Sequence, residues 1–156
     1  MVLQNSLDAL SRSGAILFPS DTVLGLGCDA TNQDAVNTIF LIKNRPQEKS
    51  LIALVADMEM LTTYVETIPQ SVHEILKGNR SPTTIVYPKA KGIAPMAMAE
   101  DGSMAFRIPK SGFALDLVKS FGKPIIATSA NLSGEPIPEN ESQVNRRILE
   151  QVDYVC

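Results

Sequence analysis

The chain has 156 residues, of which 44% are hydrophobic and 20% are charged, a composition typical of a soluble globular protein with one domain and a sizeable core. Its formal net charge of -3 argues against a surface that coats nucleic acid broadly, while a local basic cleft stays compatible with it. Cys28 and Cys156 lack metal-ligand spacing and indicate no disulfide framework, which favours a reducing cytoplasm. The N-terminus has no basic region followed by a long apolar run, so we expect no signal peptide and no membrane segment.

Apolar spacing along the chain predicts helices mixed with short strands. We expect helices over residues 2–12, 33–43, 58–64, 71–78, 112–121 and 140–149. We expect strands over residues 15–18, 22–28, 51–55, 83–87, 104–108, 124–128 and 152–155, with a loop over residues 89–102. The mixture indicates one α/β domain over residues 1–156, because no linker, repeat or low-complexity tract divides it.

Several polar residues and glycines are expected to end or begin these helices. The predicted caps are Gly14, Asn32, Asp57, a capping box from Ser71 to Glu74, Gly78, Ser111, Gly122, and Asn140 with Gln143.

Lys43 and Arg45 follow the helix whose apolar side carries Val36, Ile39 and Phe40. Pro46 cannot continue a helix and pushes Arg45 toward extended backbone, where residues two apart share a side. Two fixed cations there would suit an anion with several oxygens, such as a phosphate chain. The alternative is that these cations only complement the helix dipole and are solvated.

Ser129 and Asn131 come just after the buried strand predicted over residues 124–128. Ligands of open α/β sheets bind beyond the carboxyl ends of strands, so a hydroxyl and an amide at this place could orient phosphate or metal-bound oxygens. The alternative is an ordinary polar turn, since Ser, Asn and Gly are common turn residues.

Ser20, Asp21 and Thr22 form a second polar cluster at a strand end, which could also be a simple Ser/Thr or Asx turn. Arg107 ends an alternating strand before a proline. It is either a solvated edge residue or, if the sheet is covered on both sides, a paired one, because an unpaired buried charge is very costly.

Five motifs occur in a fixed order along most of the chain: residues 19–27, 43–46, 81–84, 107–109 and 129–134. In this order the chain resembles the YrdC/Sua5 family, the threonylcarbamoyl-AMP synthases, of which the Lys-x-Arg and Ser-x-Asn pairs are the hallmark. The resemblance implies a twisted, mixed α/β sheet with flanking helices and a concave, positively charged cavity.

The resemblance also implies a reaction of L-threonine, bicarbonate and ATP that gives threonylcarbamoyl-adenylate and pyrophosphate, for the modification of adenosine next to the anticodon of certain tRNAs. By position, Lys43, Arg45, Ser129 and Asn131 match the phosphate- and nucleotide-handling residues of the family. In the same way Ser20, Thr22, Thr84 and Arg107 match positions that line the cavity for threonine and nucleotide.

Mg²⁺ bound by the ATP phosphates is also expected, but the sequence shows no dedicated all-carboxylate site for a metal. Further expected partners are tRNA, through double-stranded RNA binding, and other proteins of the same pathway. The chain departs from the family pattern at Ser20 and Leu24, where Thr and Tyr are usual, and members commonly continue beyond the position of Cys156.

Two other functions compete with this enzyme. The first is a module that binds RNA or a nucleotide in the same cavity without turnover, although the acidic balance argues against tight nonspecific RNA binding. The second is a carbamoyl-transfer domain like that of hydrogenase-maturation proteins, which would use carbamoyl phosphate.

Overall fold

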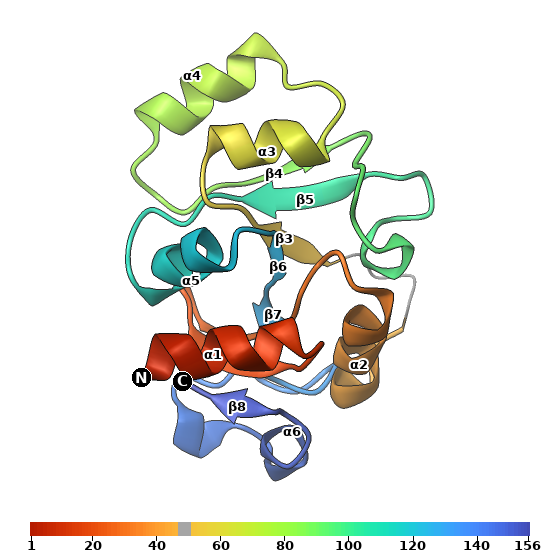
Figure 1. Cartoon of the computed structure of the whole chain (residues 1–156), viewed down its shortest axis with the longest axis vertical. Helices are drawn as coiled ribbons and strands as arrows, with labels where there is room; N and C mark the ends of the chain where they lie inside the picture. Colours follow the sequence, from red (N-terminus) through yellow and green to blue (C-terminus); the bar gives the residue numbers. More distant parts are fainter. Residues whose placement is uncertain (47–50) are drawn as a thin grey trace.

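The computed structural model describes residues 1–46 and 51–156, which form helices around two small sheets (Figure 1). The helices are α1 Val2–Ser11, α2 Gln33–Lys43, α3 Met58–Tyr64, α4 Gln70–Gly78, α5 Phe113–Phe121 and α6 Arg146–Leu149, with 3₁₀ turns η1 Pro95–Ala97 and η2 Glu141–Gln143. The strands are β1 Ile16–Pro19, β2 Leu24–Gly27, β3 Ile52–Leu54, β4 Thr84–Tyr87, β5 Met104–Arg107, β6 Ile125–Ile126, β7 Thr128–Ser129 and β8 Tyr154–Val155.

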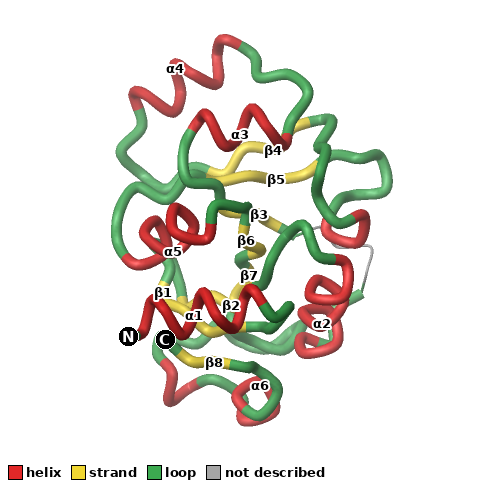
Figure 2. The backbone as a smooth tube through the Cα atoms, in the orientation of Figure 1, coloured by secondary structure: helices red, strands yellow, loops and turns green. Residues whose placement is uncertain are grey.

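The strands, yellow in Figure 2, form two sheets. Each sheet has four strands and mixes parallel with antiparallel pairs. The first has the order β7-β2-β1-β8, in which β1 runs antiparallel to β2 and parallel to β8. The second has the order β4-β5-β3-β6, in which β3 runs parallel to β5 and antiparallel to β6. The predicted α/β class with a mixed sheet and flanking helices is confirmed, with the strands divided between two sheets.

Residues 125–129 connect the two sheets directly. β6 pairs with β3 in the second sheet, and β7 pairs with β2 in the first, with Ala127 between them. The prediction of one continuous strand over residues 124–128 was therefore wrong. The chain instead changes sheets, because Ile126 N bonds to Cys28 O while Ala127 N bonds to Ile52 O on the other side.

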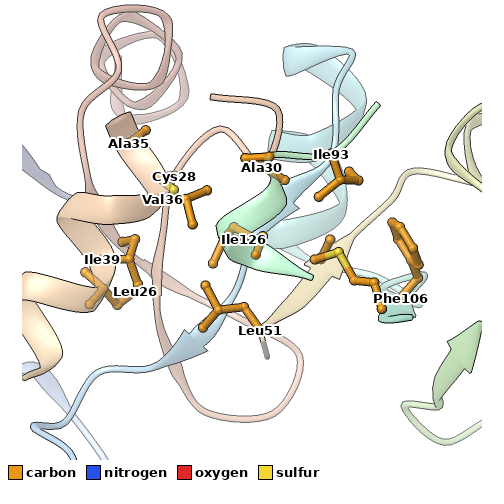
Figure 3. Close-up of a cluster of buried hydrophobic side chains, with 14 of the residues drawn as sticks. Leu26, Cys28, Ala30, Ala35, Val36, Ile39, Leu51, Ile93, Phe106 and Ile126 are labelled. Atoms are coloured by element: carbon orange, nitrogen blue, oxygen red, sulfur yellow. The ribbon is translucent and has the colours of Figure 1, made fainter. Parts of the chain in front are cut away.

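Two groups of buried side chains fill the space between the layers. In the larger group, Val36 and Ile39 of α2 pack with Leu26 and Ile126 from the two sheets and with Leu51, which precedes β3 (Figure 3). In the smaller group, α1 and α5 cover the other side of β1 through buried apolar residues that include Leu10, Phe18 and Leu117. Because apolar side chains cover both faces of this sheet, polar side chains that could contact a ligand lie at the strand ends and in the connecting turns.

The predicted caps at Asn32, Asp57 and Gly122 are confirmed. Asn32 accepts a hydrogen bond from Ala35 N at 3.0 Å, and Asp57 accepts one from Met60 N at 2.8 Å. Gly122 ends α5 with a left-handed φ of 73°. α4 ends at Gly78, also as predicted.

Four other predicted caps were wrong. Gly14 does not cap α1, because Ser13 takes the left-handed conformation with a φ of 64°. α4 begins at Gln70, so Ser71 lies inside the helix and forms no capping box. Ser111 does not cap α5, because Gly112 is the residue that precedes this helix. The predicted helix over 140–149 is split into η2 and α6; the Asn140 side chain caps neither, and Asn145 caps α6.

Among the described residues, no helix is long and apolar enough to span a membrane.

Candidate functional site

The turn between β1 and β2 is closed by one hydroxyl. Ser20 Oγ accepts hydrogen bonds from Thr22 N at 3.2 Å and from Val23 N at 3.1 Å, and it donates to Val23 O at 2.5 Å. Thr22 Oγ1 lies 3.2 Å from the same oxygen. The structure therefore shows the Ser/Thr turn that the sequence left open, and the Ser20 hydroxyl acts first on the shape of this turn.

Asn44, not Pro46, ends α2. Its φ of 50° is left-handed, and the last turn is closed by bonds from Asn44 N to Leu41 O and from Arg45 N to Phe40 O. Lys43 is still helical, so the expectation that Lys43 and Arg45 share one side of an extended segment was wrong. The reversal of the backbone at Asn44 sends the two cations into different surroundings.

Lys43 is buried, with 2% of its surface exposed, and its amine faces the chain after β7. Lys43 Nζ donates to Ser129 O at 2.5 Å, to Asn131 O at 2.8 Å and to Asn131 Oδ1 at 3.3 Å. An ammonium has three N–H donors, so these oxygens can use all of them. Burial, together with the positive charge of Arg45, lowers the pKa of Lys43 from 10.5 to about 8.

The segment from Ser129 to Glu135 folds onto the end of α2. Ser129 Oγ donates to Asn131 Oδ1 at 2.5 Å, and Asn131 Nδ2 donates to Leu132 O at 3.2 Å and to Glu135 O at 2.8 Å. Ser133 N donates to Lys43 O at 2.9 Å. Lys43, Ser129 and Asn131 are thus brought into one network although they are far apart in sequence.

A cavity of about 280 Å³ opens between the two sheets beside this network. The first sheet and its turns contribute polar groups, while β3 and the residue before it contribute an apolar part. The cavity is lined by Ser20, Thr22, Val23, Gly25, Arg45, Leu51, Ile52, Arg107, Ala127, Thr128 and Ser129.

Most of the candidate residues reach this cavity, but three do not. Arg45, Ser129, Ser20, Thr22 and Arg107 line it. Lys43 and Asn131 lie behind its wall, where they hold the segment that carries Ser129. Thr84 is exposed on β4, in register with Arg107 on the neighbouring strand, and does not belong to the described lining.

Arg107 is paired rather than solvated, which decides between the two alternatives left by the sequence. Its Nη2 lies 3.2 Å from Oδ1 of Asp21, and 11% and 9% of the two side chains are exposed. Asp21 was predicted only as a member of the polar turn from Ser20 to Thr22, with no sign that it pairs with Arg107. Its only signal was a carboxylate between two hydroxyl residues at a strand end.

The cavity therefore favours anions. Arg45 and Arg107 both line it, and although burial lowers the pKa of Arg45, a guanidinium stays charged at neutral pH. Ser129 and Thr22 add hydroxyl groups, and Val23 and Ile52 give an apolar surface. Such a lining suits a ligand with phosphate or carboxylate groups and a small apolar part.

Comparison with known proteins gives the family of this chain. A model of the Sua5/YciO/YrdC family, described as "Telomere recombination", matches residues 8–156. The chain belongs to this family. Its predicted resemblance is thereby confirmed over nearly the whole length.

Two relatives of the chain share one name. It is 33% identical over 156 residues to "Threonylcarbamoyl-AMP synthase" of Photobacterium profundum, with 98% of this chain and 84% of that protein covered. It is 35% identical over 130 residues to the protein of the same name from Hahella chejuensis, with 83% and 71% covered. A crystal structure of P. abyssi Sua5 complexed with L-threonine superposes with a TM-score of 0.92 at 29% identity. That match covers 98% of this chain but 45% of Sua5, so this chain spans less than half of that protein.

Proposed function

We propose that this protein is a threonylcarbamoyl-AMP synthase, which joins L-threonine, bicarbonate and ATP and releases pyrophosphate. Its product would serve the modification of adenosine next to the anticodon of certain tRNAs. The proposal is supported by the relatives of that name, which this chain matches over up to 99% of its length.

One observation carries the proposal: a cavity between the two sheets that has a guanidinium on each side. Arg45 reaches it from the end of α2, and Arg107 reaches it from the end of β5. The reaction needs two anionic substrates, a carbamate and a triphosphate, held close together. Two fixed cations on different elements can hold two anions without any movement of the chain.

The chemistry needs positioning more than it needs a nucleophilic side chain. The neutral amine of threonine attacks the carbon of bicarbonate, a C–N bond forms, and hydroxide leaves as water after taking a proton. A carbamate oxygen then attacks the α-phosphorus of ATP, and the bond to the pyrophosphate group breaks. Charge neutralisation at the phosphates and alignment of the two partners lower the barrier of the second step.

The candidate residues divide into two groups by place. Arg45 and Ser129, which line the cavity, would bind the phosphates, and Arg107 would bind the carboxylate of threonine. Lys43 and Asn131 would fix the segment that presents Ser129, and a phosphate would have to displace one of the oxygens now bonded to Lys43 Nζ to reach it. Ser20, Thr22 and Thr84 would border the substrates.

Mg²⁺ would arrive with ATP and offset the charge of its phosphates. The described residues contain no group of three or more His, Cys, Asp or Glu side chains that could hold a metal ion. The ligands of Mg²⁺ would therefore come mainly from the phosphates of ATP. We also propose a cytoplasmic location and contact with tRNA, including double-stranded regions, or with other proteins of the same pathway.

A pyrophosphate assay tests the proposal. The protein is incubated with ATP, Mg²⁺, L-threonine and bicarbonate, and reactions that lack threonine or bicarbonate serve as controls. Pyrophosphate release that requires both substrates supports the synthase. Release that requires carbamoyl phosphate instead would indicate a carbamoyl-transfer domain, and tight salt-dependent tRNA binding without turnover would indicate a binding module.

A further inference from the structure

Asp21 is a buried carboxylate with unusually few partners. Its side chain is 9% exposed, and it forms an ion pair with Arg107, whose Nη2 lies 3.2 Å from Oδ1. Among the described residues, neither carboxylate oxygen of Asp21 has a partner in a well-formed hydrogen bond, and the same holds for Arg107 Nε. A buried pair with so little hydrogen bonding does not recover its cost of desolvation. Stability is therefore a poor explanation for this pair.

The position of the pair indicates a different purpose. Asp21 lies in the turn between β1 and β2, and Arg107 ends β5 of the other sheet. Arg107 lines the cavity, while Asp21 does not, and both of its oxygens are closed off from solvent. A ligand in the cavity can reach Arg107 but not Asp21, so any effect of Asp21 on the ligand must pass through the guanidinium.

The contact with Asp21 involves one nitrogen of the guanidinium, Nη2. A guanidinium has five N–H donors in a rigid plane and binds a carboxylate best through two parallel bonds. The long Arg side chain needs a second fixed point to hold that plane in one orientation, and Asp21 contacts it at Nη2. Asp21 is itself fixed, because Ser20 Oγ bonds to the backbone of Thr22 and Val23 on its other side.

We propose that Asp21 is a positioning residue that orients the Arg107 guanidinium for the carboxylate of the amino-acid substrate. This inference rests on the proposed function of the cavity. The carboxylate also offsets part of the positive charge of Arg107, which makes this side of the cavity less attractive to a polyphosphate than to a single carboxylate. Asp21 thus separates the place of the amino acid from the place of ATP.

Asp21→Asn is the variant that tests this role, since it keeps the shape of the side chain and removes its charge. Steady-state pyrophosphate release is measured against L-threonine and against ATP. The KM for threonine should rise about tenfold or more, because misplaced binding groups weaken alignment, while the KM for ATP should stay the same or fall. Asp21→Glu, which keeps the charge, should recover part of the threonine KM.

Asp29→Asn is a matched control. Asp29 is buried to the same degree, with 8% of its side chain exposed, and it pairs with Lys123 outside the described lining of the cavity. Its loss should lower the melting temperature without changing either KM. If Asp21→Asn does not fold, Asp21→Glu is compared directly with wild type. Its longer side chain displaces the guanidinium, so the KM for threonine should rise above the wild-type value while the KM for ATP does not.

The outcomes separate the inference from the proposed function. Wild-type protein without threonine-dependent pyrophosphate release overturns both. In an active wild type, the inference is overturned if Asp21→Asn lowers only the melting temperature, or if it raises both KM values equally. A selective rise in the threonine KM, partly reversed in Asp21→Glu, supports it.

Discussion

Lys43 and Arg45 lie two residues apart, yet the structure gives them different tasks. Lys43 is inside the protein with its amine on Ser129 and Asn131, whereas Arg45 is half-buried and lines the cavity. Loss of Lys43 should therefore act on the shape of the site, and loss of Arg45 should act on the bound anion. The two residues call for different measurements.

We predict that Arg45→Ala reduces adenylate formation by about a hundredfold or more, because a charge that stabilises the transition state is removed from a partly desolvated site. The backbone bond from Arg45 N to Phe40 O does not need the side chain, so α2 should stay closed. Pyrophosphate release and melting temperature are measured together. Arg45→Lys should regain only part of the activity, because an ammonium lacks the planar fork.

Arg146→Ala is the control for this variant, since 87% of the Arg146 side chain is exposed and its partner Glu150 directly follows the same helix, α6. It should leave both activity and melting temperature nearly unchanged. Near-normal turnover in folded Arg45→Ala protein would contradict the proposed role. A large fall in melting temperature would show instead that Arg45 mainly stabilises the end of α2.

We also predict an alkaline limb in the pH dependence of kcat/KM, with a midpoint near the lowered pKa of Lys43, about 8. A neutral amine has two N–H donors and cannot satisfy three oxygens, so the segment that carries Ser129 should become less ordered as pH rises. Activity is measured from about pH 6.5 to 9.5. Lys43→Arg stays charged over this range, and its remaining activity should lack the fall.

The free energy of unfolding should rise as Lys43 loses its proton, whereas activity should fall. The pKa of Lys43 is about 8 in the folded protein and 10.5 ordinarily, so between these values the unfolded chain binds more protons. The penalty of the buried ammonium is fully present below about pH 8 and is relieved as pH rises toward 10.5. The free energy of unfolding of wild type, measured against Lys43→Met, should therefore increase across that range while activity falls.

At the scale of elements, one glycine allows the two sheets to approach each other. A Cβ on Gly27 of β2 would clash with Ile126 O of β6 and would lie 2.8 Å from Phe18 Cε1. We predict that Gly27→Ala lowers the free energy of unfolding by about 3 kcal/mol or more, because a backbone carbonyl in a paired strand cannot move away easily. Denaturant unfolding measures this loss.

Gly78→Ala is the matched change, since no atom lies within 4 Å of the Cβ that it would add and Gly78 has no left-handed φ. At the end of α4 it should be neutral or should stabilise the protein by about 0.5–1 kcal/mol, because alanine costs less conformational entropy in a helix. Equal losses in the two variants would show that the approach at Gly27 is not the limiting contact.

Local patterns predicted most helices and strands, but not how the chain passes between layers. Asn32 and Asp57 cap their helices because a side-chain oxygen and a nearby N–H decide that geometry alone. The break within residues 124–128 depends on Ile52 and Cys28, which bond to the segment from both sides. Such a choice between partners is made by the tertiary structure and leaves no periodic signal.

The site could be predicted as a set of residues but not as an arrangement. The Lys-x-Arg and Ser-x-Asn pairs were found from their spacing and order. That Lys43 turns inward depends on the left-handed Asn44 and on carbonyl groups of residues 129 and 131. The ion pair of Asp21 with Arg107 could not be predicted, because Arg107 belongs to the other sheet and is far away in sequence.

At the scale of the whole molecule, the cavity takes its walls from both sheets, with Gly25 and Ser129 on one and Ile52 and Arg107 on the other. We predict that ATP, Mg²⁺ and threonine together slow amide hydrogen exchange in the β1–β2 hairpin and in β3 and β5 at once. At about a hundred times Kd, binding should stabilise the fold by about 2.7 kcal/mol. Melting curves and hydrogen exchange measure the two effects.

ATP and Mg²⁺ without threonine serve as the control for this experiment. If Arg107 belongs to the amino-acid side, the control should protect the hairpin and the segment after β7 more than the end of β5. Protection confined to one sheet in the presence of all substrates would contradict a cavity filled from both sides.

The passage of residues 125–129 from one sheet to the other has a consequence for how the protein gains and loses its shape. β6 completes the second sheet and β7 completes the first, so neither sheet can come apart without pulling on the shared segment. Folding should then be a single cooperative transition, and molecules with a formed cavity beside a melted sheet should be rare. In a partly heat-inactivated sample, the remaining activity would then be proportional to the fraction of fully folded molecules, each with normal activity.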